Sequence, residues 1–255
     1  MSLNPRIDNW GDRRIWIIGA SSGIGAALAR GLQSKGARLA LSARREDALQ
    51  AIASAGDRVL PLDVTDTGQI SQAQQQLLDD WGQIDLVIYT AGTYQPMRSW
   101  ELDIPHIDEA MQIHLGGVYR LLSRILPDYL ARGSGGICLV ASVAGYTGLP
   151  KAIAYGPFKA ALINLAEILY ADLSPRGIGV YLVNPGFVET RLTAQNDFRM
   201  PALISADEAA RAIIRGLEKG CFEIAFPLRF TWWLKRFSRL PEGLRMRLLT
   251  RVARP

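Results

Sequence analysis

Short apolar runs alternate with longer amphipathic segments along most of the chain. Runs rich in aliphatic and β-branched residues predict seven strands, at 14–18, 39–43, 59–62, 86–90, 137–142, 179–183 and 222–225. Apolar residues recur with helical spacing between them, near 24–34, 45–54, 67–81, 105–131, 152–173 and 205–219. Because strands linked by helical crossovers run parallel, the pattern predicts an α/β fold: a Rossmann-like, doubly wound, seven-stranded parallel sheet between two helical layers.

The chain shows no Pro/Gly/Ser-rich linker and no internal repeat. We therefore expect one α/β domain over 1–227, followed by an amphipathic helical extension over 228–255 that is not an independent domain. Trp233, Phe237 and Leu240 share one predicted face of this extension. A second face follows, made of Leu244, Leu248 and Val252.

Charge separates the same two parts. The chain has 29 Lys and Arg against 24 Asp and Glu, for a net charge of +5. Eight basic residues and one acidic residue lie in 228–255, so the extension carries +7 and the remainder is close to neutral. The extension either packs on the body or on another subunit, which we favour from the sequence, or lies on an anionic membrane surface.

Several classes of protein are excluded early. Cys138 and Cys221 lie in apolar runs without metal-ligand spacing, so we expect neither a disulfide framework nor a metal site. The first residues lack the apolar core of a signal peptide, and no apolar run is long enough to span a bilayer. We expect a cytoplasmic protein, with 228–255 as the candidate for peripheral membrane contact. No nucleic-acid-binding module accompanies the basic residues.

A glycine-rich segment joins the first predicted strand to the first predicted helix. It contains Gly19, Ser21, Ser22, Gly23, Ile24 and Gly25. Glycines at such a turn let the backbone approach a pyrophosphate, and the N–H groups of the helix that follows favour its negative charge. The motif is specific only because it follows the first strand of a βαβ unit.

Residues at the ends of the next two strands indicate which nucleotide the protein binds. Arg44 and Arg45 follow the second strand, where NAD-binding folds place a carboxylate on the ribose 2′-hydroxyl. A guanidinium can pair with a 2′-phosphate instead, so NADP(H) is favoured over NAD(H), unless the two arginines are simply solvated. Asp63 closes the third strand and either accepts a hydrogen bond from adenine or caps the next helix.

The strongest chemical signal is Tyr155 followed by Lys159, thirteen residues after Ser142. Spacing of four places the two side chains on one face of a helix. A phenol with an ordinary pKa near ~10 is a poor proton donor and acceptor at neutral pH, but an adjacent cation favours phenolate. Ser142, at the end of the fifth strand, could hold a carbonyl oxygen beside the phenol.

These motifs together resemble the short-chain dehydrogenase/reductase family, over about residues 12–225. The resemblance implies that Tyr155 is the catalytic acid and base, that Lys159 lowers its pKa and binds the nicotinamide ribose, and that Ser142 stabilises the substrate oxygen. It implies cofactor contacts from Gly19, Ser21, Ser22, Gly23, Ile24, Gly25, Arg44, Asp63, Val64, Ala91, Gly92, Tyr155, Lys159, Pro185, Gly186, Val188 and Thr190.

Three positions depart from the family pattern. Ile18 stands where the family has Thr, and Thr90 where it has Asn, and we interpret both as structural substitutions. His114 replaces the Asn that holds a relay water behind the lysine. A neutral imidazole both donates and accepts, so His114 either supports the relay as a fourth catalytic residue or is a buried helix residue that weakens it.

The resemblance implies a reductase or dehydrogenase that transfers hydride between NADP(H) and a carbonyl or secondary alcohol. Apolar residues in 191–205, among them Leu192, Phe198, Met200 and Leu203, either favour a hydrophobic substrate or serve ordinary packing of the substrate loop. A homodimer or homotetramer is expected from the same resemblance. The alternative is a nicotinamide-nucleotide-binding sensor or scaffold with weak turnover, which is supported only by the presence of His114.

Overall fold

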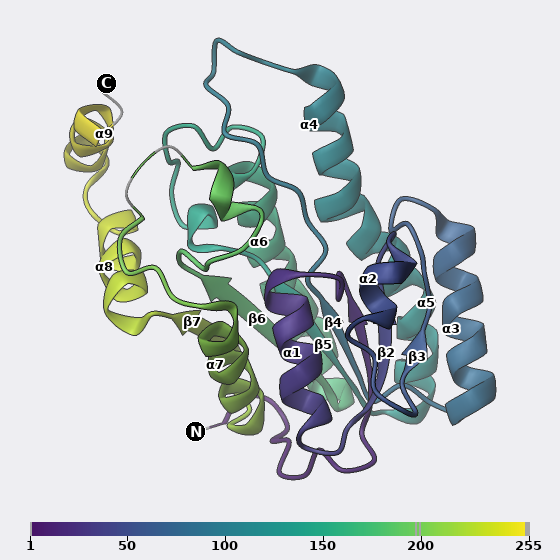
Figure 1. Ribbon diagram of the computed structural model, residues 1–255. Helices are drawn as coiled ribbons and strands as arrows, with labels where there is room; N and C mark the ends of the chain where they lie inside the picture. Colours follow the sequence, from purple (N-terminus) through teal and green to yellow (C-terminus); the bar gives the residue numbers. More distant parts are fainter. Residues whose placement is uncertain (1, 197, 199, 253–255) are drawn as a thin grey trace.

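The computed structural model describes residues 2–196, 198 and 200–252. Seven strands form one parallel sheet in the order β3-β2-β1-β4-β5-β6-β7 (Figure 1). Their bounds are β1 (Arg14–Ile18), β2 (Arg38–Ser42), β3 (Arg58–Val59), β4 (Leu86–Tyr89), β5 (Gly135–Val140), β6 (Ile178–Pro185) and β7 (Glu223–Phe226). The order reverses between β1 and β4, which confirms the predicted doubly wound sheet.

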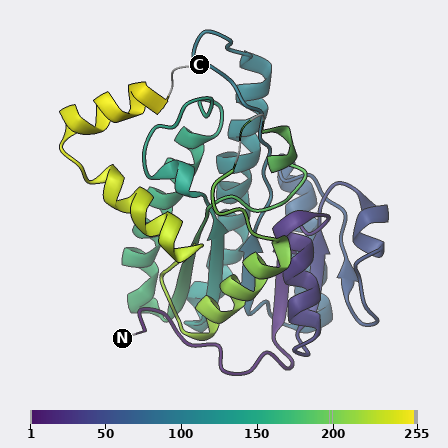
Figure 2. The same cartoon turned by 60° about the vertical axis from the view of Figure 1, so that its left-hand side comes forward.

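Helices cover both faces of the sheet. One layer contains α1 (Gly23–Gln33) and α7 (Ala206–Glu218), which pack side by side. The other layer contains α3 (Thr67–Trp81), α5 (Gly117–Arg132) and α6 (Gly156–Leu173). Figures 1 and 2 show the sheet enclosed between the two layers.

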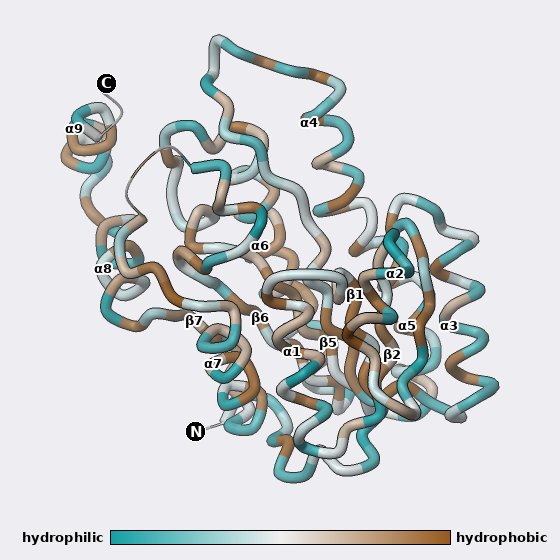
Figure 3. Tube along the Cα trace, viewed as in Figure 1, coloured by the Kyte–Doolittle hydropathy of each residue, from teal (hydrophilic) through white to brown (hydrophobic). Residues whose placement is uncertain are grey.

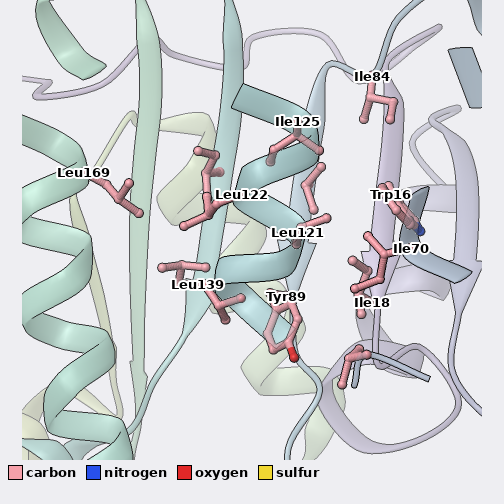
Figure 4. Close-up of a cluster of buried hydrophobic side chains, with 14 of the residues drawn as sticks. Trp16, Ile18, Ile70, Ile84, Tyr89, Leu121, Leu122, Ile125, Leu139 and Leu169 are labelled. Atoms are coloured by element: carbon pink, nitrogen blue, oxygen red, sulfur yellow. The ribbon is translucent and has the colours of Figure 1, made fainter. Parts of the chain in front are cut away.

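Each face of the sheet has its own core, and alternation along β1 supplies both. Trp16 and Ile18 belong to the cluster beneath α3, α5 and α6, part of which is drawn in Figure 4. Ile15 and Ile17 point to the opposite side and join the cluster beneath α1 and α7. Strands buried on both faces account for the unbroken apolar runs of the sequence, seen as brown segments at the centre of Figure 3.

Two predicted elements are shorter than expected at the β3 edge of the sheet. β3 contains only two residues. The backbone amides of Leu60 and Leu62 still donate hydrogen bonds, the first to β2 and the second to the residue that follows β2. Pro61 between them has no N–H to donate, so regular pairing stops. The helix predicted at 45–54 is only α2 (Glu46–Gln50).

The long helix predicted at 105–131 is interrupted. The structure has α4 (Ile104–Met111), a π-helical turn over Gln112–Gly116, and then α5. The Tyr89 hydroxyl donates to the carbonyl of Ile113 at 2.6 Å inside that turn. A Cβ at Gly117 would lie 2.2 Å from the same hydroxyl, so the close approach of the helix to β4 requires glycine there.

The extension forms α8 (Leu228–Ser238) and α9 (Glu242–Val252). α8 packs against β7, whereas α9 extends beyond the sheet (Figure 1). Within the described residues, no helix is long and apolar enough to cross a lipid bilayer. The boundary that we expect at residue 227 coincides with the turn between β7 and α8 and stays a prediction.

Candidate active site

A pocket of about 500 Å³ opens at the carboxyl ends of the strands. Every residue that the sequence proposed for catalysis or cofactor binding lines it: Gly19, Ser21, Ser22, Gly23, Ile24, Gly25, Arg44, Asp63, Val64, Ala91, Gly92, His114, Ser142, Tyr155, Lys159, Pro185, Gly186, Val188 and Thr190. These residues come from the ends of β1 to β6 and the segments after them, from the first turns of α1 and α6, and from the π-helical turn. The fold therefore brings together side chains that lie up to about 170 positions apart.

The glycine-rich turn is built for close backbone approach. Gly19 has a φ of +92°, which favours glycine, and a Cβ there would lie 2.5 Å from the amide nitrogen of Ala91. A Cβ at Gly25 would lie 2.3 Å from the carbonyl oxygen of Gly19. Ser22 precedes α1 without capping it through its side chain, so the first N–H groups of the helix face the pocket. This arrangement fits a phosphate group.

Arg44 and Arg45 line the pocket beyond β2, and no carboxylate follows that strand before α2. The Arg44 guanidinium lies 4.0 Å from the Glu109 carboxylate, with both side chains more than half exposed. Such a solvent-exposed ion pair is weak, so it does not hold Arg44 away from an anionic ligand. The donor set fits a 2′-phosphate.

Asp63 does not cap α3, because Asp66 accepts from the amides of Gly68 and Gln69 at the start of that helix. Of the two sequence interpretations of Asp63, helix capping is therefore wrong. One carboxylate oxygen of Asp63 instead accepts from the backbone amide and the hydroxyl of Thr65, both at 2.8 Å. This local turn holds the carboxylate at the rim of the pocket, beside Val64.

Ser142, Tyr155 and Lys159 converge at the end of β5. Tyr155 is the residue directly before α6, and Pro157 in the first turn explains why the helix begins at Gly156 and not at 152. The Lys159 Nζ lies 5.3 Å from the centre of the Tyr155 ring and donates to the carbonyl of Val140 at 3.0 Å. The Ser142 hydroxyl is hydrogen-bonded to the Tyr155 phenol.

The acid–base balance of this group differs from the sequence expectation. Burial raises the pKa of Tyr155 to about 12, and the hydrogen bond from Ser142 only partly opposes it. Burial also lowers the pKa of Lys159 to about 7. The expectation that the neighbouring cation lowers the phenol pKa is therefore wrong for the protein alone, because burial disfavours the charged form of both groups.

His114 is fully buried in the π-helical turn behind this group. Its Nε2 lies 2.8 Å from the carbonyl oxygen of Thr93 and 3.3 Å from the Thr93 amide nitrogen. The shorter contact is with an oxygen that can only accept, so it favours the tautomer with the proton on Nε2. Nδ1 is then an acceptor that is buried without a partner among the described residues. Burial and the Lys159 charge lower the pKa of His114 to about 3, so the imidazole is neutral. The ring meets that of Tyr155 edge to face, with centroids 5.6 Å apart.

The other two departures from the family pattern have structural explanations. The Thr90 hydroxyl donates to the carbonyls of Ile18 and Gly19, at 2.9 and 3.1 Å, and so ties β4 to the start of the glycine-rich turn. Ile18 is fully buried among the apolar residues of the core. Neither residue presents a side chain that the pocket chemistry needs.

Some residues of the pocket were missed by sequence reasoning. The segment after β6 adds Thr193 and Gln195, and the segment after β4 adds Thr93. The Thr193 hydroxyl donates to the carbonyl of Val188 at 2.6 Å and so folds the segment around Thr190. Such a local contact leaves no pattern in the sequence. Arg45 and Leu192, in contrast, belong to segments that the sequence had singled out.

The described residues contain no cluster of three or more His, Cys, Asp or Glu side chains suited to a metal ion. The groups present are instead a buried phenol, a buried amine and a hydroxyl beside a phosphate cradle. Such a set can bind a dinucleotide and exchange a proton with an oxygen atom held near Ser142 and Tyr155.

Comparison with known proteins agrees with this geometry. A family model described as short chain dehydrogenase matches residues 13–199. A relative from Myxococcus xanthus, described as an uncharacterized oxidoreductase, is 33% identical over 248 residues and covers 95% of this chain and 96% of its own. The crystal structure of a short-chain dehydrogenase from Streptomyces avermitilis is 25% identical, covers 94% and 96% of the two chains, and has a TM-score of 0.79.

A short chain dehydrogenase from Burkholderia cenocepacia, solved in complex with NADP, shares the fold with a TM-score of 0.83 at 23% identity, covering 97% of this chain and 100% of that chain. The chain described here belongs to the short-chain dehydrogenase family, and it is an NAD(P)-dependent oxidoreductase. The alternative of a nicotinamide-binding sensor is not favoured by these relatives.

Proposed function

We propose that the protein transfers hydride between NADP(H) and a carbonyl or secondary alcohol, with an apolar substrate. The observation that carries the proposal is the convergence of Ser142, Tyr155 and Lys159 in the same pocket that the glycine-rich turn and Arg44 line. The first group suits proton transfer to oxygen, and the second suits a phosphorylated dinucleotide.

The bound nicotinamide supplies the hydride chemistry. The chain holds the substrate oxygen between the Ser142 hydroxyl and the Tyr155 phenol, and Tyr155 donates or removes the proton on that oxygen. With a pKa raised to about 12, the phenol is protonated at neutral pH but is a weak acid, so a nearby positive charge has to stabilise the phenolate as the proton leaves. Reduction of a carbonyl is thus the direction that the protonation state of the protein alone supports.

The Lys159 ammonium lies under the phenol ring and is positioned to bind a ribose hydroxyl while it favours the developing phenolate. His114 acts behind it as a neutral residue, and its unpaired Nδ1 is available to a proton donor in a relay. The turn from Gly19 to Gly25 would hold the pyrophosphate of a bound dinucleotide, Asp63 and Val64 would contact its adenine, and Thr190 would contact its carboxamide.

Preference for NADP(H) over NAD(H) rests on Arg44, which follows β2 where a carboxylate would repel a 2′-phosphate. An apolar substrate is supported by Leu192, Phe198 and Leu203, which remain exposed on the segment bordering the pocket. We further propose a homodimer or homotetramer. Tyr119 and Leu130 on α5 and Ile168 on α6 are exposed, and contact between copies would bury them.

The experiment is a panel of ketones, aldehydes and secondary alcohols, assayed with NADPH or NADP⁺ and in parallel with NADH or NAD⁺. Oxidation of NADPH by at least one carbonyl compound, faster than oxidation of NADH, is expected. Turnover with NADH alone would overturn the cofactor preference. Tight NADPH binding without turnover on any compound would favour the sensor.

A further inference from the structure

The two sides of α8 have different surroundings. On the inner side, the Lys235 ammonium pairs with the Glu223 carboxylate, which also accepts from Tyr146 at 2.5 Å and from Asn184 at 2.9 Å. Phe230 packs on the ring of Phe187, with centroids 5.7 Å apart. Polar and aromatic contacts therefore fasten this helix to the body.

The outer side of α8 is apolar and uncovered. Leu228 is 76% exposed and Trp233 is 68% exposed, and half of the surface of Trp232 is exposed as well. Trp233 belongs to the face that we expected to pack on the body or on another subunit, so packing on the body is wrong for this residue. The two indoles meet edge to face, with centroids 5.0 Å apart.

α9 continues the same character. Leu244 and Met246 are exposed on it, and Leu248 is only half-buried. The helix lies beyond the edge of the sheet in both views (Figures 1 and 2). Val252, the last member of the face predicted there, has a side chain outside the described part of the structure.

Positive charge surrounds these apolar residues. Exposed arginines are spread over both helices, at Arg229, Arg236, Arg239, Arg247 and Arg251. Among the described residues of α8 and α9, only Lys235 forms a salt bridge with an acidic side chain. The Arg236 guanidinium lies over the Trp232 ring at 4.7 Å from its centre, so the charge and the aromatic ring occupy one surface.

The mouth of the pocket lies at the same end of the molecule. The loop before α4 exposes Trp100 and Leu102, and the first residue of α4, Ile104, is exposed as well. Figures 1 and 2 both show this loop and α9 at the end where the strands finish. Figure 3 shows apolar positions on both segments. Exposed apolar residues thus occur on two segments that reach this end of the molecule, one of which is the cationic pair of helices.

We propose that α8 and α9 bind the protein peripherally to an anionic lipid surface. Tryptophan and leucine side chains would enter the boundary between headgroups and acyl chains, and the arginines would pair with lipid phosphates. Charge complementarity selects this occupant. The extension carries +7, whereas residues 1–227 of a second copy carry only about −2 and offer little attraction to it. Lipid binding by these helices does not depend on the proposed hydride transfer.

The test is co-sedimentation of the full-length protein with vesicles of phosphatidylcholine containing one third phosphatidylglycerol, and with vesicles of phosphatidylcholine alone. We expect binding to the anionic vesicles at low salt and weaker binding at high salt. The double variant Trp232→Ala/Trp233→Ala should bind the anionic vesicles at least about tenfold more weakly than the native protein. Arg239→Gln/Arg247→Gln should also bind more weakly, with a smaller dependence on salt.

The matched control is Leu3→Ala/Arg38→Gln, which removes an exposed apolar and an exposed basic side chain at the opposite end, where the strands begin. It should bind as the native protein does. Circular dichroism and thermal unfolding verify that all variants fold.

Three results would overturn the proposal. The native protein could stay in the supernatant, it could bind neutral and anionic vesicles equally, or the tryptophan variant could bind undiminished. Light scattering distinguishes the other occupant. If the native protein does not bind vesicles and the tryptophan variant has a smaller particle mass than the native protein, the surface is a contact between copies.

Discussion

Single residues of the pocket show how far chemistry can be inferred from residue type and spacing. The separation of Tyr155, Lys159 and Ser142 was sufficient to place them together, because it depends only on a strand end and the first turn of a helix. Their pKa values were not predictable, because burial of Tyr155 and Lys159 is a property of the assembled pocket. The neighbours of an ionisable side chain can therefore be predicted from the sequence more readily than its burial.

His114 gives a prediction about pH and stability. Its pKa is lowered from 6.5 to about 3 by burial, so the unfolded state binds a proton in this range that the folded state does not. The stability that the neutral imidazole permits is fully present above pH 6.5 and is lost as the pH falls toward 3. Between pH 6.5 and 5, the free energy of unfolding should fall with pH more steeply in the native protein than in His114→Asn. The difference between the two slopes should be at most about 1.4 kcal/mol per pH unit.

Urea unfolding of both proteins at the two pH values measures this difference. Equal slopes would show that the imidazole is solvated or already charged. The same variants test the relay. If His114→Leu turns over substrate as fast as the native protein, His114 has no part in proton transfer.

Arg44 gives a prediction about cofactor choice. Replacing Arg44 with Ala removes a charged donor from the expected position of the 2′-phosphate, while the exposed ion pair with Glu109 contributes little. The dissociation constant for NADPH should rise about tenfold, with that for NADH nearly unchanged. Fluorescence titration with both nucleotides measures this, and Arg38→Ala is the exposed control. An equal change for both nucleotides would remove Arg44 from cofactor recognition.

At the scale of elements, regular strands and helices were predicted well and their interruptions were not. Periodicity locates α3 at its observed bounds. It does not show that the helix at 105–131 breaks, because the break depends on contact between the turn at Gln112–Gly116 and Tyr89 on a distant strand. The early end of β3, in contrast, has a visible cause in Pro61.

The glycine-rich turn can be tested as an element. Gly25→Ala places a Cβ 2.3 Å from the Gly19 carbonyl oxygen, so the turn must shift. NADPH binding should weaken at least tenfold, and thermal stability should fall. The control is Gly243→Ala on α9, where a Cβ meets nothing within 4 Å. Calorimetric titration and thermal unfolding give both quantities, and unchanged NADPH affinity in Gly25→Ala would contradict the assignment of the turn.

The attachment of α8 is a second element to test. Lys235→Met leaves Glu223 with only Tyr146 and Asn184 as partners, so the helix should open more often. We expect faster trypsin cleavage within α8, with a loss of at most about 1 kcal/mol in stability, since the pair is partly exposed. Lys219→Met, an exposed lysine outside α8, is the control. Equal cleavage rates in native, variant and control proteins would show that the ion pair does not hold the helix.

For the whole molecule, the sequence indicated one nucleotide-binding body and one cationic extension, and the structure shows how differently the two are constrained. The body is fixed by two cores on the faces of one sheet. The extension is fixed along one side of α8 only, and its indoles remain outside. Amphipathicity alone could not reveal which side would be covered, because a charged residue, Lys235, shares the inner contact with the apolar Phe230.

Tyr155 is central to the account, and a comparison of two tyrosines tests its role most directly. Tyr94 lies against Tyr155, with ring centroids 5.1 Å apart, so Tyr94→Phe is a matched change in the same surroundings. The measurement is the rate of NADPH oxidation with the best carbonyl substrate of the panel, alongside NADPH affinity. Tyr155→Phe should lose turnover roughly 10²- to 10⁴-fold while still binding NADPH, and Tyr94→Phe should keep most of its activity. Full turnover in Tyr155→Phe would contradict the account.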